Sequence, residues 1–453
     1  LPDVTVQKED AQRAYRLTAK DAALEYAGEH IGGALWQYFE GRADAESALA
    51  AMRAAARTTR GRLSRSAVRS LYGDALRLSA SQMDKARACH FAYFLRYGLR
   101  AKERTGAGFD APQIGTFVHD VMEHTLRAAK TRGGLHTLEK AALHALVQEA
   151  IADYKARVLP DLSEKSARFR YLFDRLCDST QRIMDEVADE LKHSDFEPMA
   201  FELAFGPGGQ LPAITVREKG GTARVVGKVD RVDGWEHGGK LYLRVVDYKT
   251  GRKSFDLAEV RYGLGLQMLL YLFALEQAGG ALFGGKEIVP AGVLYTPARE
   301  PMLRCARDTA PEKIEKARKK ELRRSGMVLE EPAVLQAMEH SALEEPSYLP
   351  IAVKKDGTVT GNLASEGQFE KLARYVDRVL REIAGEVFSG NIDADPYART
   401  PQQSACTYCE FASACHFEEG SGSDRMEYIK ATKNDEFWQH IDEVNGEGAR
   451  ENG

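Results

Sequence analysis

The stretch "GKVDRVDGWEHGGKLYLRVVDYKTG", residues 227–251, decides the fold of this chain. Two valine-rich runs flank the pair Gly238 and Gly239, a pattern that predicts a β-hairpin. Side chains alternate between the two faces of a strand, so one face of the second run carries Leu241, Leu243, Val245, Asp247 and Lys249. The first three predict a buried face, and the last two place an acid and a base at its end.

A carboxylate in such a setting is costly unless it is paired or bound to a metal. Lys249 could simply pair with Asp247, but Asp230 adds a second carboxylate from the valine run of the preceding strand. Two acids and one base leave excess negative charge, which a divalent cation would neutralise, and Mg²⁺ or Mn²⁺ prefers such oxygen ligands. The peptide carbonyl of Tyr248 is a further candidate ligand. Lys249 could orient or deprotonate a water molecule, or balance charge on a phosphate.

Composition sets broad limits on function. The chain has 453 residues, of which 43% are hydrophobic and 29% charged, as in a globular protein with two to four domains or one domain with insertions. A net charge of −4 means that any contact with nucleic acid comes from a local basic lining. The most apolar window, residues 264–283, contains Gln267 and Glu276, which predicts a buried helix rather than a membrane span.

The ends and the cysteines point to a cytoplasmic location. The first residues, "LPDVTVQKED", lack the basic start and apolar block of a signal peptide, and they lack an initial methionine. We therefore expect a cytoplasmic chain that belongs to a longer protein and has no membrane partner. Six cysteines in a reducing compartment more often indicate metal binding than disulfides.

Periodicity along the chain predicts helices, then a mixed sheet, then further helices, which is an α/β fold. We expect helices over 1–75, and in the segment 76–99 an aromatic-rich amphipathic helix that follows the cap-like sequence "SASQ". A charged helical insertion is expected over about 130–195. Strands are expected over 199–206, 213–251 and 286–298, and helices over 258–278, 311–324 and 367–389. The residues after 420 predict a polar, frayed tail.

A second cluster of chemistry-bearing residues lies near the C-terminus. "CTYCEFASAC" gives Cys406, Cys409 and Cys415 with the spacing C-x₂-C-x₅-C, which indicates a soft metal or a cluster. Candidates for a fourth ligand are Cys89, Cys177, Cys305 and His416. Tetrahedral zinc and a 4Fe–4S cluster both fit these residues.

The hairpin resembles the core of the PD-(D/E)XK nucleases, in their RecB-like branch. That branch carries a G-x-x-D-R-hydrophobic-D strand, a hydrophobic-D-Y-K-T strand and a Q-x-x-x-Y helix, here "GKVDRVD", "VVDYKT" and "QMLLY". The resemblance implies a restriction-endonuclease-like fold, a mixed sheet flanked by helices. It implies metal ligation by His119 in "GTFVHDVMEH" and by Asp230 and Asp247. It implies catalytic or supporting roles for Lys249, Glu202 in "FELAF", Gln267 and Tyr271.

Plainer interpretations of four of these positions stay open. His119 could be an ordinary helix residue beside Glu123, four positions on. Glu202 alternates with the apolar neighbours in its strand, so it could face solvent. Gln267 and Tyr271 share a helix face. They could contact a DNA backbone, brace Lys249, or be polar positions on a core helix.

Three further segments resemble the AddB subunit family of helicase–nucleases: "RLSASQMDKARACHFAYFLRYGL", "AGVLYTPAR" and the cysteine tail. In that family and in the CRISPR-adaptation nucleases, one cysteine ahead of the core joins three behind it around a 4Fe–4S cluster. The resemblance implies that Cys89, Cys406, Cys409 and Cys415 form this set and fasten the start of the domain to its end. It also implies that 1–75 is a remnant of a helicase-like region, 76–420 the nuclease domain and 421–453 a tail.

The expected function is a Mg²⁺-dependent deoxyribonuclease. It would cut single-stranded DNA delivered by a helicase subunit resembling AddA, in double-strand-break repair and recombination. Two alternatives are a stand-alone exonuclease of the CRISPR-adaptation type and a catalytically inert DNA-binding or scaffold module. "GALFGGKE" mimics a phosphate-binding loop, but Glu287 stands where Ser or Thr would hold Mg²⁺, so ATP hydrolysis is assigned to a partner. The basic run 313–326 is interleaved with Glu315 and Glu321, which favours a solvated helix face over a phosphate-tracking surface.

Overall fold

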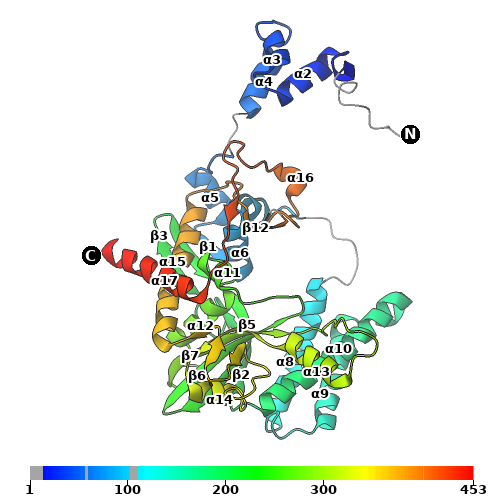
Figure 1. Cartoon of the computed structure of the whole chain (residues 1–453), viewed down its shortest axis with the longest axis vertical. Helices are drawn as coiled ribbons and strands as arrows, with labels where there is room; N and C mark the ends of the chain where they lie inside the picture. Colours follow the sequence, from blue (N-terminus) through cyan, green and yellow to red (C-terminus); the bar gives the residue numbers. More distant parts are fainter. Residues whose placement is uncertain (1–13, 57–59, 103–110, 401, 452–453) are drawn as a thin grey trace.

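A six-stranded mixed sheet organises the molecule (Figure 1). The structure, a computed structural model, describes residues 14–56, 60–102, 111–400 and 402–451. The strand order is β11-β8-β7-β6-β5-β2, in which β6–β7 and β8–β11 are parallel and the other pairs antiparallel. The strands are β2 (Glu197–Phe205), β5 (Gly227–His237), β6 (Lys240–Lys249), β7 (Glu287–Pro297), β8 (Ser325–Leu329) and β11 (Leu363–Ala364). The prediction of a mixed sheet is confirmed.

The predicted hairpin is present as β5 and β6. Their ladder runs from Arg231 opposite Val246 to His237 opposite Lys240. The turn is the pair Gly238 and Gly239, which adopt φ of +58° and +80°, values that a tight hairpin turn requires and that glycine adopts without strain. Strand β6 then pairs with β7 along its whole length, so it is central in the sheet.

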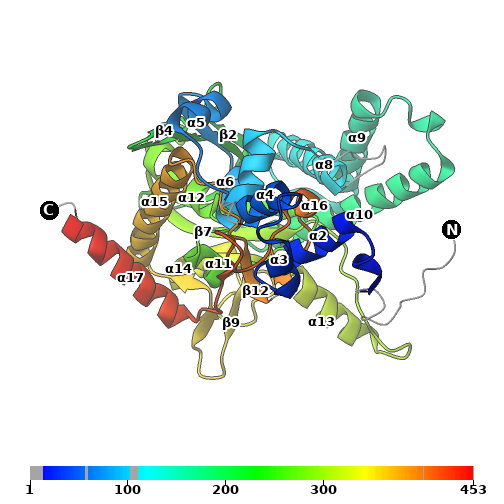
Figure 2. The same ribbon diagram turned by 90° about the horizontal axis from the view of Figure 1, so that it is seen from above.

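Helices cover both faces of the sheet (Figures 1 and 2). Leu243 and Val245 of β6 face one core, which includes α12 (Gln267–Ala278) and α15 (Glu366–Phe388). Val246 and Tyr248 face the other core. That second core is formed with α8 (Ala111–Thr131), α9 (Lys140–Val158) and α10 (Ala167–Lys192), and the short 3₁₀ turn Leu162–Glu164 joins the last two.

Two predictions about helices were wrong. The single helix expected over 258–278 is two helices, α11 (Leu257–Arg261) and α12, because Gly263 and Gly265 between them adopt φ of +78° and +65°. The tail expected to be frayed contains α17 (Asn434–Glu451). It buries an apolar stripe that includes Phe437 and Ile441 in the core that α15 helps to form.

A smaller three-stranded sheet, of order β1-β4-β3, is built from strands that come before the hairpin in the sequence. Its strands are β1 (Ala75–Leu78), β3 (Ile214–Glu218) and β4 (Gly221–Val225). Strand β1 leads directly into α6 (Ala80–Ala88), whose start is fixed by a reciprocal Ser79–Gln82 capping box. Helix α7 (His90–Tyr93) and the π-helical turn Phe94–Gly98 follow, with α5 (Arg65–Tyr72) packed beside them.

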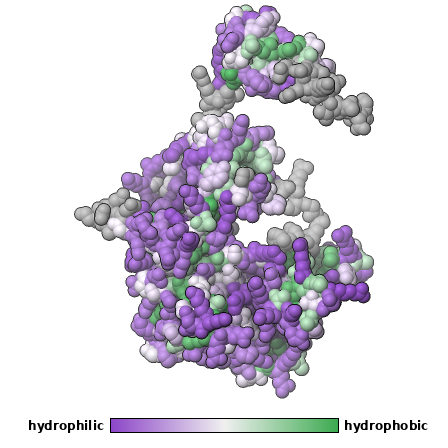
Figure 3. All heavy atoms as spheres, viewed as in Figure 1, coloured by the Kyte–Doolittle hydropathy of each residue, from purple (hydrophilic) through white to green (hydrophobic). Residues whose placement is uncertain are grey.

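The first helices form a module with its own small core around Trp36 and Phe39. They are α2 (Lys20–Glu29), α3 (Ala34–Phe39) and α4 (Glu46–Ala56), and they stand apart from the main body in Figure 1. Hydrophilic residues cover most of the surface seen in Figure 3. Among the described residues, every helix is too short or too polar to cross a lipid bilayer.

The remaining elements are short and lie around these layers. The helices are α13 (Pro311–Leu322), α14 (Pro332–Met338) and α16 (Ala412–Cys415). The strands are β9 (Ile351–Val353), β10 (Val359–Gly361), β12 (Tyr397–Thr400), β13 (Gln403–Ser404) and β14 (Glu427–Tyr428).

Candidate active site

The two strands of the hairpin part where their acidic residues lie. The ladder ends at Arg231 opposite Val246, so the next backbone groups of β6 need other partners. The N–H of Tyr248 donates to Oδ2 of Asp230 at 2.9 Å, and the carbonyl of Tyr248 accepts from Nε2 of His119 at 2.9 Å. Side chains from β5 and α8 therefore hold the backbone of Tyr248 at the point where the sheet opens.

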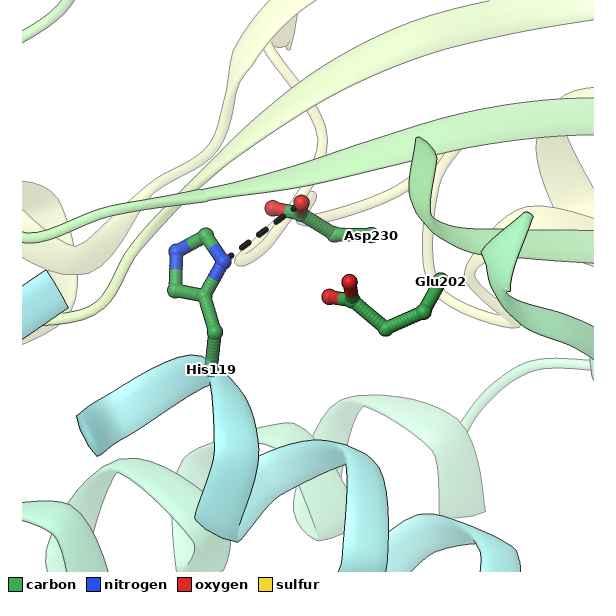
Figure 4. A group of neighbouring side chains, drawn as sticks. All are labelled: His119, Glu202 and Asp230. Carbon is green, nitrogen blue, oxygen red and sulfur yellow. Dashed lines mark ion pairs between the residues drawn. The ribbon is translucent and has the colours of Figure 1, made fainter. Parts of the chain in front are cut away.

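Three potential metal ligands converge on this opening (Figure 4). Ligand atoms of His119, Glu202 and Asp230 all lie within 4.8 Å of one another. Nδ1 of His119 is 3.4 Å from Oδ1 of Asp230, and the three side chains remain partly exposed, by 27%, 16% and 13%. One imidazole and two carboxylates with access to solvent can bind a divalent cation.

Glu202 reaches this group because its backbone is unusual. Its φ is +49°, a left-handed conformation that is uncommon for a residue other than glycine. The kink breaks the alternation of β2, so that Phe201 packs in one core and Leu203 in the other. Glu202 therefore lies across from Asp230 and pairs with Lys228 instead of facing solvent, and the alternation argument from sequence was wrong here.

Asp247 combines burial with an incompletely neutralised charge. It is 4% exposed, and Nζ of Lys249 lies 2.6 Å from its Oδ2, yet that oxygen makes no directional hydrogen bond in the described structure. Burial raises the pKa of Asp247 to about 6, the Asp230 carboxylate adds to the rise, and Lys249 opposes it. Lys249 thus pairs with Asp247, but this ion pair does not neutralise the second carboxylate, that of Asp230.

The histidine responds to the same negative charge. Burial lowers the pKa of His119, but its interactions with Asp230 outweigh this and the net shift is upward. The buried carboxylate of Asp247, two further carboxylates and an imidazole form a donor set that fits a hard divalent cation. The fold, and not the local sequence, brings His119 of α8, Glu202 of β2 and Asp230 of β5 together, whereas Asp247 of β6 lies near them but outside this group.

Tyr271 of α12 lies beside Gly227, the first residue of β5, and Gln267 is one helical turn before it. The Tyr271 ring is 3% exposed and stacks on Phe205 with a centroid distance of 5.3 Å. Burial raises the pKa of its hydroxyl to about 12, and the Lys228 backbone and the Gln267 side chain oppose this rise. A Cβ on Gly227 would lie 1.9 Å from this hydroxyl, so glycine is required there. The structure therefore places Tyr271 as a buried support of the hairpin.

Sequence reasoning missed a second charged group behind the hairpin. Arg231, Asp233 and Arg244 are fully buried on the opposite face of β5 and β6. Asp233 accepts from Arg231 and from Arg244, each at 2.9 Å. Glu190 of α10 bonds Arg324 at 2.6 Å and lies 3.5 Å from Arg244. We call Arg231, Asp233, Arg244, Glu190 and Arg324 the buried ionic network.

This network reaches the active-site face through Tyr248. Arg231 donates to the Tyr248 hydroxyl at 2.6 Å, while the backbone of Tyr248 is held by Asp230 and His119. The arginine of "VDRVD" and the tyrosine of "VDYKT" thus meet behind the sheet. The signal in the sequence was a run of charges at alternate positions in strands that are otherwise apolar.

Cys89 lies against the C-terminal segment that carries Cys406, Cys409 and Cys415. Cys89, at the junction of α6 and α7, is buried with Phe411, and Cys409 packs against them. The N–H of Cys409 donates to the Cys406 carbonyl at 3.1 Å, and the Arg60 guanidinium donates to the Cys415 carbonyl at 2.9 Å. Burial raises the pKa of Cys89 to about 12 and raises those of Cys406 and Cys415. Without a bound cation these groups are therefore thiols.

The other two cysteines lie elsewhere. Cys177 is half-buried on α10, and Cys305 is exposed in the segment before α13. Packing with Cys409 thus distinguishes Cys89 from Cys177 and Cys305 as a candidate for the fourth ligand, and His416, next to Cys415 in the sequence, remains the other candidate.

Comparison with known proteins identifies the family of this chain. The PD-(D/E)XK nuclease superfamily model matches residues 77–416. Curated relatives named as the B subunits of ATP-dependent helicase/deoxyribonucleases include those of Desulforudis audaxviator, 35% identical over 374 residues, and Caldanaerobacter subterraneus subsp. tengcongensis, 33% identical over 392 residues. A third, from Thermoanaerobacter sp. strain X514, is 32% identical over 386 residues.

These matches cover 82–85% of this chain but only 32–33% of each relative, so the chain spans about a third of their length. The family model, by contrast, covers most of the chain. It includes the β5–β6 hairpin, the candidate metal ligands His119, Glu202, Asp230 and Asp247, and the cysteines Cys89, Cys406, Cys409 and Cys415. The chain belongs to the PD-(D/E)XK nuclease superfamily.

Proposed function

We propose that this chain is a Mg²⁺-dependent deoxyribonuclease that hydrolyses phosphodiester bonds of single-stranded DNA. The observation that carries the proposal is the convergence of His119, Glu202 and Asp230 beside the Asp247–Lys249 pair at the opening of the hairpin. A paired structural site would neutralise its acids internally, whereas this one retains excess negative charge and solvent access.

His119, Asp230 and Asp247 would hold the cation, with the Tyr248 carbonyl and Glu202 as further candidate ligands. When bound, the cation would lower the pKa of a water molecule and neutralise charge on the phosphate. Asp230 already fixes the Tyr248 N–H, so the same carboxylate orients β6 and faces the ligand position.

Lys249 would serve the attacking water or a phosphate oxygen. Its ammonium group is held by Asp247 and lies 5.7 Å from the centre of the Tyr295 ring, which limits the positions that it can adopt. A cation placed beside the reacting phosphate stabilises the charge that develops there. Gln267 and Tyr271 would act indirectly, by fixing the first residues of β5.

The test uses the full chain and an end-labelled oligonucleotide, offered as a single strand and as a duplex. We expect cleavage with Mg²⁺ and none with EDTA, and faster cleavage of the single strand. Absence of cleavage of either substrate with Mg²⁺ or Mn²⁺, in protein that binds the metal, would favour the inert DNA-binding module. Equal rates on both substrates would contradict the single-strand preference alone.

The proposed setting is a helicase–nuclease that processes double-strand breaks in the cytoplasm. The support is the name of the relatives, which contain about twice as much additional chain as this match covers. A helicase subunit resembling AddA would feed the strand to this site. Co-purification of the full-length protein with such a helicase, and stimulation of cleavage by ATP in the complex only, would test this. A stand-alone exonuclease would show neither.

We also propose that Cys89, Cys406, Cys409 and Cys415 bind a 4Fe–4S cluster. Tetrahedral zinc would use the same four thiolates. The resemblance of these four positions to the cysteines that surround a 4Fe–4S cluster in the AddB family favours the cluster. Iron and acid-labile sulfide in anaerobically purified protein would support it. Stoichiometric zinc without iron would contradict it.

A further inference from the structure

A cationic cavity adjoins the active site on the Lys249 side. It has a volume of about 310 Å³ and lies between the loop after β6, the end of β7 and the start of β8. Its wall contains five cationic side chains, Lys249, Arg252, Lys253, Arg299 and Arg323, and one carboxylate, Glu321. We call it the basic cavity.

The charge of the basic cavity is not a reflection of overall composition. The whole chain carries a net charge of −4, whereas this wall is strongly positive. The larger groove beside α13 differs, because its lysines alternate with Glu312, Glu315, Glu344 and Glu345. Local concentration of one sign of charge in a concave site indicates an oppositely charged ligand.

Two of these five cations, Arg252 and Arg299, lack strong partners among the described residues, whereas Lys249 pairs with Asp247. Arg252 is exposed and makes no ion pair among the described residues. Arg299 reaches Glu321 only at 4.0 Å, and its Nε is buried without a hydrogen-bond partner in the described structure. Arg323 donates to the carbonyl of Pro346. Lys253, by contrast, is paired with Glu259 at 3.0 Å. A buried donor without a partner is costly unless a ligand supplies the acceptor.

The lining also argues against a small organic ligand. Pockets for such ligands are mostly apolar with a few polar groups, whereas five of the eleven residues here are cationic. Arginine and lysine side chains bind phosphates, which positions a nucleic acid without reading its sequence. Lys249 lines this wall and also pairs with Asp247 at the candidate metal site, so a DNA strand could pass from the basic cavity to that site.

We propose that the basic cavity binds backbone phosphates of the DNA strand adjacent to the phosphodiester that is cut. This inference rests on the proposed nuclease function and assigns the substrate's path from it. Arg252 and Arg299 are the phosphate-binding residues, and Lys249 lies at the junction with the reacting group. Binding here is independent of base sequence and sensitive to salt.

The test is binding of a fluorescent single-stranded oligonucleotide to the full chain in EDTA, measured by anisotropy over a range of salt concentrations. The variant is Arg252→Gln with Arg299→Gln. The control is Lys313→Gln with Lys316→Gln, which removes the same charge from exposed lysines of α13 outside the basic cavity. Thermal melting of all three proteins establishes that they are folded.

We expect affinity in low salt to fall about tenfold or more in the Arg252/Arg299 variant, and the slope of log K against log salt to fall by about 1.4, or 0.7 for each lost phosphate contact. The control should bind like the wild type. Arg252→Lys with Arg299→Lys should restore most of the binding. Equal losses in variant and control, or no loss in either, would overturn the inference.

Two further arms separate the possible failures. Inorganic phosphate at constant ionic strength should compete weakly, and displacement of the strand at micromolar phosphate would assign the basic cavity to a small anion instead. A wild type that binds through Arg252 and Arg299 but cuts nothing would contradict the proposed function and leave this inference standing. A wild type that cuts DNA, together with a variant that retains full affinity, would contradict this inference and leave the proposed function standing.

Discussion

The two faces of the β5–β6 hairpin both carry charged side chains, but they solve the problem of burial differently. On one face the buried ionic network is closed to solvent: Arg231 and Arg244 share Asp233 while Glu190 faces Arg324, so three guanidinium groups lie against two carboxylates. On the other face Glu202, Asp230 and Asp247 outnumber the cations that touch them, and the group opens to solvent.

This difference separates structure from chemistry. A closed, fully buried set of charges contributes rigidity, and the loss of one member leaves another uncompensated. An open acidic set retains unsatisfied charge that a ligand can neutralise. Variants on the buried face should therefore change stability, and variants on the open face should change activity and metal binding.

The largest effect is expected for Asp247→Asn. Cleavage should fall by about 10³-fold or more, equivalent to about 4 kcal/mol of transition-state stabilisation, because the cation loses a ligand and Lys249 its partner. The metal-free protein should be no less stable, since the change removes a carboxylate that repels Asp230. Single-turnover cleavage and urea denaturation measure the two quantities. A loss of stability that accounts for the lost activity would remove the contrast between the faces.

Asp233→Ala should have the largest effect on stability. It leaves Arg231 and Arg244 buried without their shared acceptor, at a cost of about 3–5 kcal/mol. Asp195→Ala is the matched control, because its pair with His340 is exposed and should contribute less than about 1 kcal/mol. Denaturant unfolding of both variants gives the comparison. Similar small losses of stability in the two variants would contradict the stabilising role of Asp233 in the buried ionic network.

Acid should destabilise the protein through the same network. Burial raises the pKa of Glu190, but Arg324, Arg244 and Arg231 outweigh it, and the pKa in the folded protein falls from 4.5 to about 2. The unfolded chain therefore binds the proton more tightly, and stability is present above pH about 4.5 and is lost as pH falls toward 2. The loss is about 3 kcal/mol. In Glu190→Gln this part of the pH dependence should be absent, and its persistence would contradict the assignment.

The smallest effect is expected for Lys228→Gln. Lys228 is 57% exposed, so its pair with Glu202 should contribute less than about 1 kcal/mol to stability. The change frees Glu202 from a competing cation, and Mn²⁺ affinity should rise by a few fold. Calorimetric titration of wild type and variant measures this. Weaker Mn²⁺ binding in the variant would mean that Glu202 does not face the ligand position.

The sequence predicted the hairpin, the burial of Asp247 and the mixed sheet because alternation and glycine turns are local properties. It could not predict the position of Glu202, since nothing in "FELAF" signals a left-handed glutamate. The buried ionic network was missed because charged residues in strands are normally read as solvent-facing, and only the packing of α10 covers them. Two signals were present in the sequence but were overlooked. The polar composition of the tail hid the apolar stripe of α17, and the length of the apolar run hid the glycines between α11 and α12.

The central claim is that a divalent cation binds among the carboxylates at the opening of the hairpin. Its most direct test is anomalous diffraction from crystals of the full chain soaked in Mn²⁺, for the wild type and for Asp230→Asn. We predict an anomalous peak between Asp230 and Asp247 in the wild type and none in the variant. A well-ordered wild-type site without a peak at neutral pH, or an equal peak in both proteins, would contradict the account.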